Sequence, residues 1–106
     1  MAKDPPNLVV YFDEDAQKEY ERLEKAHRAS FARKLKKLAT RREQPSPKNA
    51  LHGFGPGYYK IKLRKAGLRL VYHYDGKRLR IIVIAVGKRE RNIVYEAVRA
   101  RLEGRL

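Results

Sequence analysis

The chain has 106 residues, a formal net charge of +14 and no cysteine. This length suits one domain with a single modest core (residues 1–106), and the lack of cysteine excludes disulfides and thiolate chemistry. The longest apolar run, Ile81 to Val86, is too short to span a membrane, and the N-terminus lacks a signal-peptide pattern, so we expect a soluble, cytoplasmic protein.

The charge is unevenly distributed along the chain. Residues 1–24 carry 7 acidic and 3 basic side chains, residues 25–56 carry 1 and 9, and residues 57–106 carry 4 and 14. A strongly basic surface attracts polyanions and accelerates encounter with them. Nucleic acid is therefore the leading partner class, and an acidic protein is the second.

The N-terminal part predicts a strand followed by two helices. Asn7 to Phe12 is rich in β-branched and aromatic residues, which favours a strand. Asp13 is the expected N-cap of the first helix, because its side chain can accept backbone N–H groups of the first turn. Apolar residues then recur at helical spacing over about 14–25 and 29–40, which indicates a helical hairpin. One long helix with His27 on its apolar stripe is the alternative.

Gln44 to Pro47 ends the second helix, since proline removes a backbone donor and forces its predecessor out of the α region. The loop that follows ends in a glycine-rich segment, His52 to Gly57. This segment lacks the P-loop spacing, and no helix follows it. It is better interpreted as a connector than as a phosphate cradle.

Three more strands are predicted at about 58–64, 68–74 and 77–86. The segment Tyr74 to Lys77 contains Asp-Gly, which is typical of a two-residue type I′ turn. That turn would pair Tyr74 with Lys77, and the next pairs would be Tyr72 with Leu79, Leu70 with Ile81, and Leu68 with Val83. For the preceding turn, pairing Arg64 with Arg69 places the apolar residues of both strands on one face.

This register collects basic side chains on the opposite face of the sheet. Neighbours two apart on a strand lie about 6–7 Å from one another, which is close to the span of a phosphodiester and its neighbours. The face would also include Val71, Ile82 and Ile84. Its polar members are Lys60, Lys62, Arg64, Arg69, His73, Arg78 and Arg80.

A final helix is expected after residues 87–91. Its apolar stripe comprises Val94, Ala97, Val98 and Leu102. Tyr95 lies on the border of that stripe, where a ring can pack while its hydroxyl stays available. The chain thus has an α+β pattern: an N-terminal strand, a helical hairpin, a three-stranded antiparallel segment and a C-terminal helix.

The residue inventory restricts the possible chemistry. The histidines His27, His52 and His73 are scattered, so no catalytic triad and no metal cluster is apparent, and no cofactor is expected. Clustered Lys, Arg and Tyr side chains can nevertheless cleave RNA by positioning a 2′-hydroxyl, stabilising the phosphorane and transferring protons. Neighbouring positive charges lower the pKa of a lysine and make it a better base. A passive phosphate-binding face is the alternative interpretation of the same residues.

The chain also resembles the RelE toxins of bacterial and archaeal toxin–antitoxin systems. The resemblance rests on three segments: Tyr59 to Arg64, Gly67 to Tyr72, and Val86 to Arg91. It covers nearly the whole chain and implies one small RelE-like domain of the microbial RNase type. It further implies a metal-independent endoribonuclease, an mRNA interferase that enters the ribosomal A site and cuts the codon there, leaving a 2′,3′-cyclic phosphate and a 5′-hydroxyl. Such an enzyme inhibits translation and arrests growth.

The resemblance implies catalytic roles for five residues. Lys62 would be the proton acceptor or main transition-state stabiliser, while Lys60 and Arg69 would hold the scissile phosphate. Arg89 would assist the leaving group, and Tyr95 would stack on or orient the substrate nucleotide. Further contacts with RNA or the ribosome are expected from a larger basic set: Lys34, Lys36, Lys37, Arg41, Arg42, Arg64, His73, Arg78 and Arg80. A merely solvated helix face is the alternative for those between 34 and 42.

The family also implies partners. A RelB-like antitoxin would neutralise the toxin and could displace the last helix, and operator DNA would be bound only by the toxin–antitoxin complex. No membrane partner is expected. His52 and the glycine-rich loop depart from the family pattern, which affects codon preference and ribosome contacts more than the core chemistry.

Two other functions are compatible with the sequence. A ParE-like toxin of the same fold would bind DNA gyrase and cut no RNA, although such relatives generally lack the five-residue set. A non-catalytic RNA-binding protein would explain the charge but not the positions of Arg89 and Tyr95.

Overall fold

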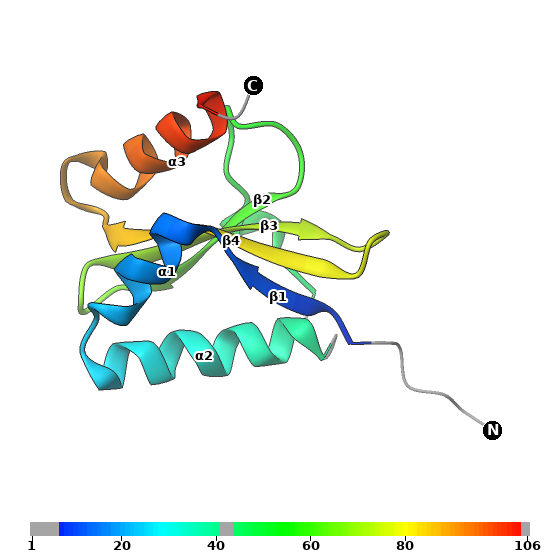
Figure 1. The fold of residues 1–106 in the computed structure, drawn as a ribbon, viewed down its shortest axis with the longest axis horizontal. Coiled ribbons are helices and arrows are strands. Elements are labelled where there is room, and N and C mark those ends of the chain that lie inside the picture. Colours follow the sequence, from blue (N-terminus) through cyan, green and yellow to red (C-terminus); the bar gives the residue numbers. More distant parts are fainter. Residues whose placement is uncertain (1–6, 41–43, 105–106) are drawn as a thin grey trace.

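A computed structural model describes residues 7–40 and 44–104 of the chain. Its elements follow the order that the sequence predicts (Figure 1). They are β1 (Val9–Phe12), α1 (Glu14–Glu21), α2 (Lys25–Ala39), the 3₁₀ turn η1 (Pro47–Asn49), β2 (Tyr58–Leu63), β3 (Leu68–Asp75), β4 (Arg80–Lys88), the 3₁₀ turn η2 (Glu90–Asn92) and α3 (Ile93–Glu103).

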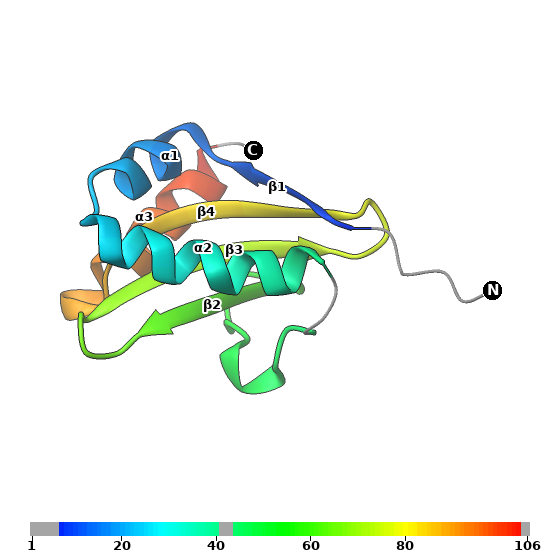
Figure 2. The same cartoon turned by 90° about the horizontal axis from the view of Figure 1, so that it is seen from below.

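The four strands form one mixed sheet in the order β1-β4-β3-β2. Strand β3 pairs antiparallel with both β2 and β4, which confirms the predicted three-stranded segment, and β1 adds to β4 in parallel. The two views show α2 against one face of the sheet and α3 against the other (Figures 1 and 2). The α+β prediction is therefore confirmed, and β2 forms one edge of the sheet.

The helical region confirms two helices. Asp13 caps α1, since its Oδ2 atom accepts hydrogen bonds from the backbone N atoms of Asp15 (3.0 Å) and Ala16 (3.3 Å). Residues 22–24 separate α1 from α2, and the Tyr20 hydroxyl donates to the carbonyl oxygen of Arg28 at 2.8 Å across this turn. The alternative of one long helix is wrong.

The predicted hairpin between β3 and β4 is wrong in register. Asp75 lies opposite Arg80, and the loop therefore contains four residues, 76–79, rather than two. The Asp75 Oδ1 atom accepts hydrogen bonds from the backbone N atoms of Lys77 and Arg78, at 3.1 and 3.0 Å. An aspartate that accepts these backbone N–H groups occupies the first position of a turn rather than its centre. The loop therefore begins after Asp75 and is longer than predicted. Leu79 completes the turn with φ of 54°.

A bulge between Val71 and Tyr72 shifts the register of β4 again. Beyond it, Leu70 lies opposite Val86 instead of Ile81. One extra residue exchanges the two faces of a strand. Along β4, Ile81 and Val83 therefore face the first core before the bulge, and Val86 faces it after the bulge, while Ile84 and Ala85 both face the second core.

The register between β2 and β3 also differs from the prediction, by two residues. Lys62, not Arg64, lies opposite Arg69. Gly67 has φ of +66° and its N–H donates to the carbonyl oxygen of Arg64 at 3.2 Å, so the turn occupies residues 64–67. Because side chains alternate with a period of two, this shift leaves every residue on its predicted face.

Two apolar clusters pack on opposite faces of the sheet. The first contains residues of α1, α2 and the predicted apolar face, including Phe31, Leu70 and Ile81, each fully buried. The second lies under α3 and comprises the buried residues Val71, Ile84, Ala85, Val94 and Val98. The second face was expected to be openly cationic, but α3 covers much of it.

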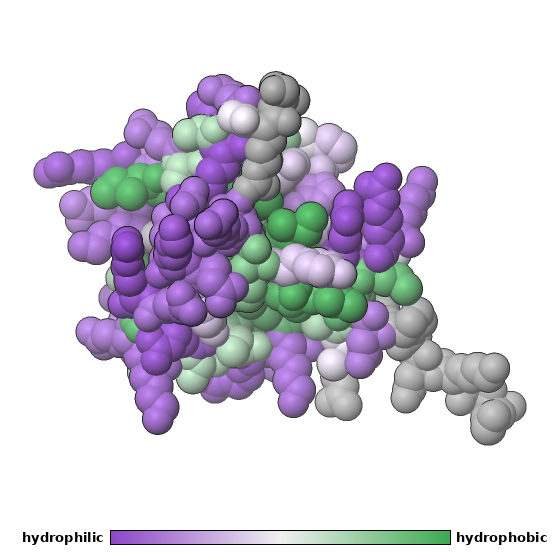
Figure 3. All heavy atoms as spheres, in the orientation of Figure 1, coloured by the Kyte–Doolittle hydropathy of each residue, from purple (hydrophilic) through white to green (hydrophobic). Residues whose placement is uncertain are grey.

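The side of the molecule around β1 carries exposed apolar residues. Val9 and Tyr11 are 53% and 52% exposed on this strand. Figure 3 shows apolar side chains gathered there between hydrophilic side chains of the helices and the β3–β4 hairpin. No helix in the described ranges 7–40 and 44–104 is long and apolar enough to cross a membrane.

Candidate active site

Beside α3, the part of the second face that the helix leaves open forms a basic hollow. We call it the cationic cavity; its volume is about 430 Å³. It contains all five residues with predicted catalytic roles, together with one predicted RNA contact. Its lining is Lys60, Lys62, Arg64, Arg69, Arg89 and Tyr95.

Strands β2 and β3 hold the floor of the cationic cavity. Lys62 lies opposite Arg69 in the ladder, and Lys60 lies two residues along on the same face. Between the lysines, Ile61 is buried in the first core, which fixes the outward orientation of its neighbours. Arg69 is only 7% exposed, and its Nη1 atom donates to the carbonyl oxygen of Leu68 at 2.8 Å.

The segment after β4 brings Arg89 and Tyr95 to the same cavity. The backbone N of Arg89 donates to the carbonyl oxygen of Gly67 at 2.9 Å, which joins this segment to the β2–β3 turn. Arg91 and Asn92 then take φ of 54° and 58°, a left-handed pair that turns the chain into α3. Tyr95 is half-buried against the second core and still lines the cavity, which confirms its position on the helix border.

The surroundings of the cationic cavity lower the pKa of one of its lysines. Desolvation lowers the pKa of Lys62, and the positive charges of Arg64, Lys60, Arg69 and Lys48 lower it further. None of the six residues that line the cavity is acidic. The arrangement can bind a phosphate with several cations and can supply a neutral amine at a pH below the ordinary lysine range.

An ion pair that the sequence analysis did not identify anchors α3. Arg101 binds Glu19 of α1 through two hydrogen bonds of 2.8 Å, from Nη1 to Oε1 and from Nη2 to Oε2. Its Nη1 atom also donates to the carbonyl oxygen of Ile84 at 2.9 Å, and Glu19 Oε1 accepts the backbone N–H of Val86 at 3.1 Å. The hydrogen bonds with Glu19 raise the pKa of Arg101. No local motif joins positions 19 and 101, so only the fold reveals the pair.

Three predicted RNA contacts lie at the opposite end of the sheet. His73 packs on Tyr58 with ring centroids 4.7 Å apart. Arg78 and Arg80 lie 3.5 and 3.9 Å from Asp75 Oδ2. Asp75 is six residues, about 20 Å, along β3 from Arg69, whereas His73 is only two residues, about 7 Å, beyond Val71, the partner of the cavity residue Lys60. A role for these three in binding RNA stays a prediction.

The basic residues of α2 are separated from the cationic cavity by edge strand β2. Lys34 lines a cavity together with Lys60, Lys62 and Arg64. Lys36 and Lys37 are exposed on α2 and do not line the cationic cavity. The predicted contacts Arg41 and Arg42 lie outside the described residues.

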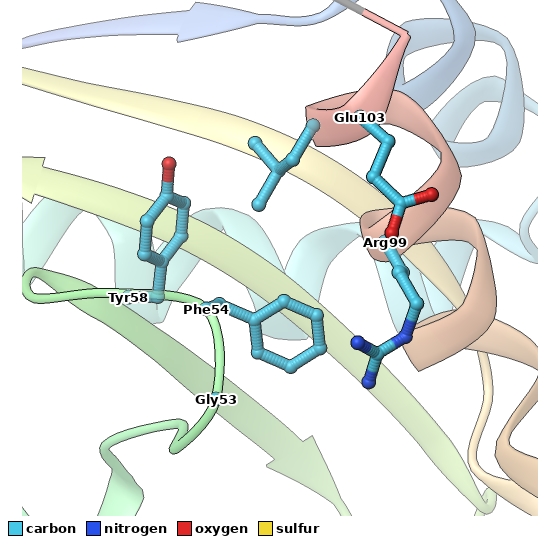
Figure 4. Close-up of a pocket in the computed structure, with 6 residues that line it drawn as sticks. Gly53, Phe54, Tyr58, Arg99 and Glu103 are labelled. Atoms are coloured by element: carbon cyan, nitrogen blue, oxygen red, sulfur yellow. The ribbon is translucent and has the colours of Figure 1, made fainter.

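A separate pocket of about 410 Å³ lies between the glycine-rich loop and the end of α3. Figure 4 shows Phe54 beside Arg99, whose guanidinium carbon is 5.1 Å from the ring centroid, with Tyr58 and Glu103 close by. His52 is exposed and outside this pocket. The contact joins the loop to α3 and is distinct from the cationic cavity. In the part of the chain that the structure describes, no three His, Asp or Glu side chains are placed to share a metal ion.

Known proteins match this chain over most of its length. Residues 10–93 match the family described as the ParE toxin of the type II toxin–antitoxin system parDE. A RelE-like toxin protein of Escherichia coli is 48% identical over 93 residues, covering 88% of this chain and 95% of the relative. The mRNA interferase toxin RelE of Escherichia coli K12 is 44% identical over 90 residues, covering 83% and 90%.

Solved structures extend the similarity to the fold. The free-state structure of an Escherichia coli RelE mutant superimposes with a TM-score of 0.78 at 35% identity, covering 91% of this chain and 98% of that one. RelE in the intact Escherichia coli RelBE toxin–antitoxin complex gives 0.69 at 38% identity, with 79% and 99% covered. The chain therefore belongs to the RelE family of toxins, and it also matches the ParE toxin family of type II toxin–antitoxin systems.

Proposed function

We propose that this protein is a ribosome-dependent mRNA endonuclease that cuts the codon in the ribosomal A site and is neutralised by a RelB-like antitoxin. The observation that carries the proposal is the meeting of Lys60, Lys62, Arg69, Arg89 and Tyr95 in one cavity. Relatives named mRNA interferase RelE support the reaction class, and the RelBE complex supports the partner. Such a toxin acts on mRNA in the cytoplasm, and with its antitoxin it binds operator DNA.

The proposed reaction needs no group beyond these side chains and solvent. Lys62 takes the proton of the ribose 2′-hydroxyl, whose oxygen attacks the adjacent phosphorus atom. Lys60 and Arg69 stabilise the negative charge on the non-bridging oxygens. The bond to the 5′-oxygen breaks while Arg89 stabilises the departing oxygen with hydrogen bonds, and that oxygen takes a proton from solvent, which leaves a 2′,3′-cyclic phosphate and a 5′-hydroxyl.

Tyr95 has a different role in this proposal. Its ring is held by the second core and its exposed part borders the cavity, so it can stack on the substrate nucleotide. The nucleotide would then be oriented for in-line attack. A misplacement of about 1 Å is enough to slow such a reaction by about a hundredfold.

The proposal is tested by adding the purified protein to a translating extract and mapping mRNA 5′ ends by primer extension. We expect new ends within codons held in the A site, and none when the cognate antitoxin is added first. Absence of A-site cuts would contradict the proposal, as would equal cutting of the same mRNA without ribosomes.

The name of the matching family favours one rival, a toxin that binds DNA gyrase. A supercoiling assay with gyrase and relaxed plasmid separates the two. If the protein is an mRNA endonuclease, gyrase should supercoil the plasmid at its usual rate at protein concentrations that cut all ribosome-bound mRNA. Inhibition of supercoiling without mRNA cleavage would support the rival.

A further inference from the structure

A second cavity borders the cationic cavity across edge strand β2. We call it the edge cavity; its volume is about 300 Å³, and it lies between α2, the segment 44–49 and β2. Lys60, Lys62 and Arg64 line both cavities. The two hollows are therefore two parts of one surface that bends around the edge of the sheet.

The edge cavity adds two further lysines and a side-chain amide to this surface. Lys34 and the exposed Lys48 add positive charge, and half-buried Asn49 contributes a side-chain amide. That amide has no hydrogen-bond partner among the residues that the structure describes. Lysines bind phosphate without regard to sequence, whereas an asparagine amide can donate to and accept from the edge of a base. The set suits a nucleotide better than a lone anion.

Part of the edge of β2 is left open for such a ligand. On the edge of β2 that faces away from β3, the pairing among the described residues consists of a bridge between Ala50 and Tyr59 and a hydrogen bond from Leu51 N to Tyr58 O of 2.8 Å. The cavity lies beyond that point, alongside Lys60 to Arg64. The pKa of Lys62 is lowered mainly by desolvation and further by neighbouring cations. Lys48 is close enough to be one of these cations.

We infer that the edge cavity binds the nucleotide next to the scissile phosphate of the RNA, with Lys48 and Lys34 holding its phosphate and Asn49 contacting its base. This inference rests on the proposed function and makes Lys48 and Asn49 determinants of substrate binding and base preference. The RNA strand would cross β2 at Lys60 and Lys62, which touch both cavities. An acidic peptide is the other polyanion that could occupy the same lysines, but it offers no base edge to Asn49.

The test measures binding of fluorescent RNA octamers whose 2′-hydroxyls are methylated, so that they cannot be cleaved. Four octamers that differ in base are titrated at several salt concentrations. Replacing one lysine that contacts a phosphate should reduce the slope of log affinity against log salt by about 0.7 for single-stranded RNA. We expect this reduction for Lys48→Met. The matched control is Lys77→Met, an exposed lysine of the β3–β4 loop, which should retain the wild-type slope.

Asn49→Ala is expected to keep the wild-type slope and to reduce the affinity difference between the best and worst octamer by about fivefold or more. An unchanged slope in Lys48→Met would overturn the inference, as would unchanged discrimination in Asn49→Ala. Equal binding of an octaglutamate peptide with the same dependence on Lys48 would also overturn it.

The outcomes separate this inference from the proposed function. If the wild type cuts A-site codons but Lys48→Met binds octamers normally, the inference fails and the proposed function stands. If both substitutions alter octamer binding as expected but the wild type cuts no mRNA on ribosomes, the nucleotide site stands and the nuclease proposal fails.

Discussion

The two faces of the sheet are built differently although they share the same strands. The face toward α1 and α2 is apolar along its length and closed by the first core. The face toward α3 is apolar only under that helix, where Val71 and Ile84 are buried. Beside the helix it ends in the cationic cavity. The first face thus serves stability along most of its length and opens only at the edge cavity beside β2, while the other combines stability with the cationic cavity.

This difference shows how a small chain supports a cluster of like charges. Lys62 and Arg69 repel one another, so the strands that carry them need stabilisation from elsewhere. The closed face supplies this stabilisation. Ile61 and Leu70, the pair next to Lys62 and Arg69 in the ladder, are both buried there. We therefore expect substitutions on the two faces to have separable effects on folding and on cleavage.

The largest effect is expected on the closed face. Leu70→Ala removes a fully buried side chain at the centre of the first core and should reduce the free energy of unfolding by about 2–5 kcal/mol. Urea denaturation monitored by circular dichroism measures it. A loss below about 1 kcal/mol would mean that this face does not carry the stability assigned to it.

The cationic cavity should show the reverse behaviour. Lys62→Met and Arg89→Met should each slow single-turnover mRNA cleavage on ribosomes by about a hundredfold or more. Their free energies of unfolding should stay within about 0.5 kcal/mol of the wild type, as for Lys77→Met. Normal cleavage by both variants would show that the catalytic assignment is wrong.

A smaller effect is expected at the ion pair that joins the two faces. Glu19→Gln removes the charge that binds Arg101 through two hydrogen bonds and should destabilise the fold by about 1.5–3 kcal/mol. Amide hydrogen exchange should rise first in α3. Glu21→Gln, an exposed position on the same helix, is the control and should change little. Equal exchange in α3 of both variants would contradict the role of this pair.

The smallest effect concerns pH. The folded-state pKa of Lys62 is lowered, so the neutral amine forms below the ordinary lysine range and cleavage should rise with pH there. Because the unfolded chain binds more protons between the two pKa values, stability also rises with pH across that interval. Lys60→Met removes a neighbouring charge and should move the rise in cleavage toward higher pH, while Lys62→Arg should abolish it. A pH profile that is unchanged in both variants would show that Lys62 is not the base.

Local patterns predicted much of this fold. Asp13 as a helix cap, the two N-terminal helices, the succession of elements along the chain and the position of Tyr95 follow from spacing and residue type. The shared face of Lys60, Lys62 and Arg69 was predicted even though the pairing was displaced by two residues, because an even shift preserves alternation. The catalytic roles came from the resemblance, since composition alone also allowed a passive basic face.

The remaining features depend on contacts between distant parts of the chain. The bulge between Val71 and Tyr72 has no signature in the local sequence, yet it decides which residues of β4 face α3. Asp75 was interpreted as a central turn residue, whereas its side chain organises a longer loop. Glu19 and Arg101, like Lys48 and Asn49, acquire their roles only when separate elements are brought together.

The most direct test of the central claim replaces the 2′-hydroxyl at the cut nucleotide. A ribosome-bound mRNA is made with a single 2′-deoxy substitution there, and cleavage is compared with that of the unmodified message. If the cationic cavity activates the 2′-hydroxyl as nucleophile, the deoxy message should remain uncut at this position, and the unmodified message should yield a 2′,3′-cyclic phosphate. Cleavage of the deoxy message at the normal rate, with a linear phosphate end, would contradict the account.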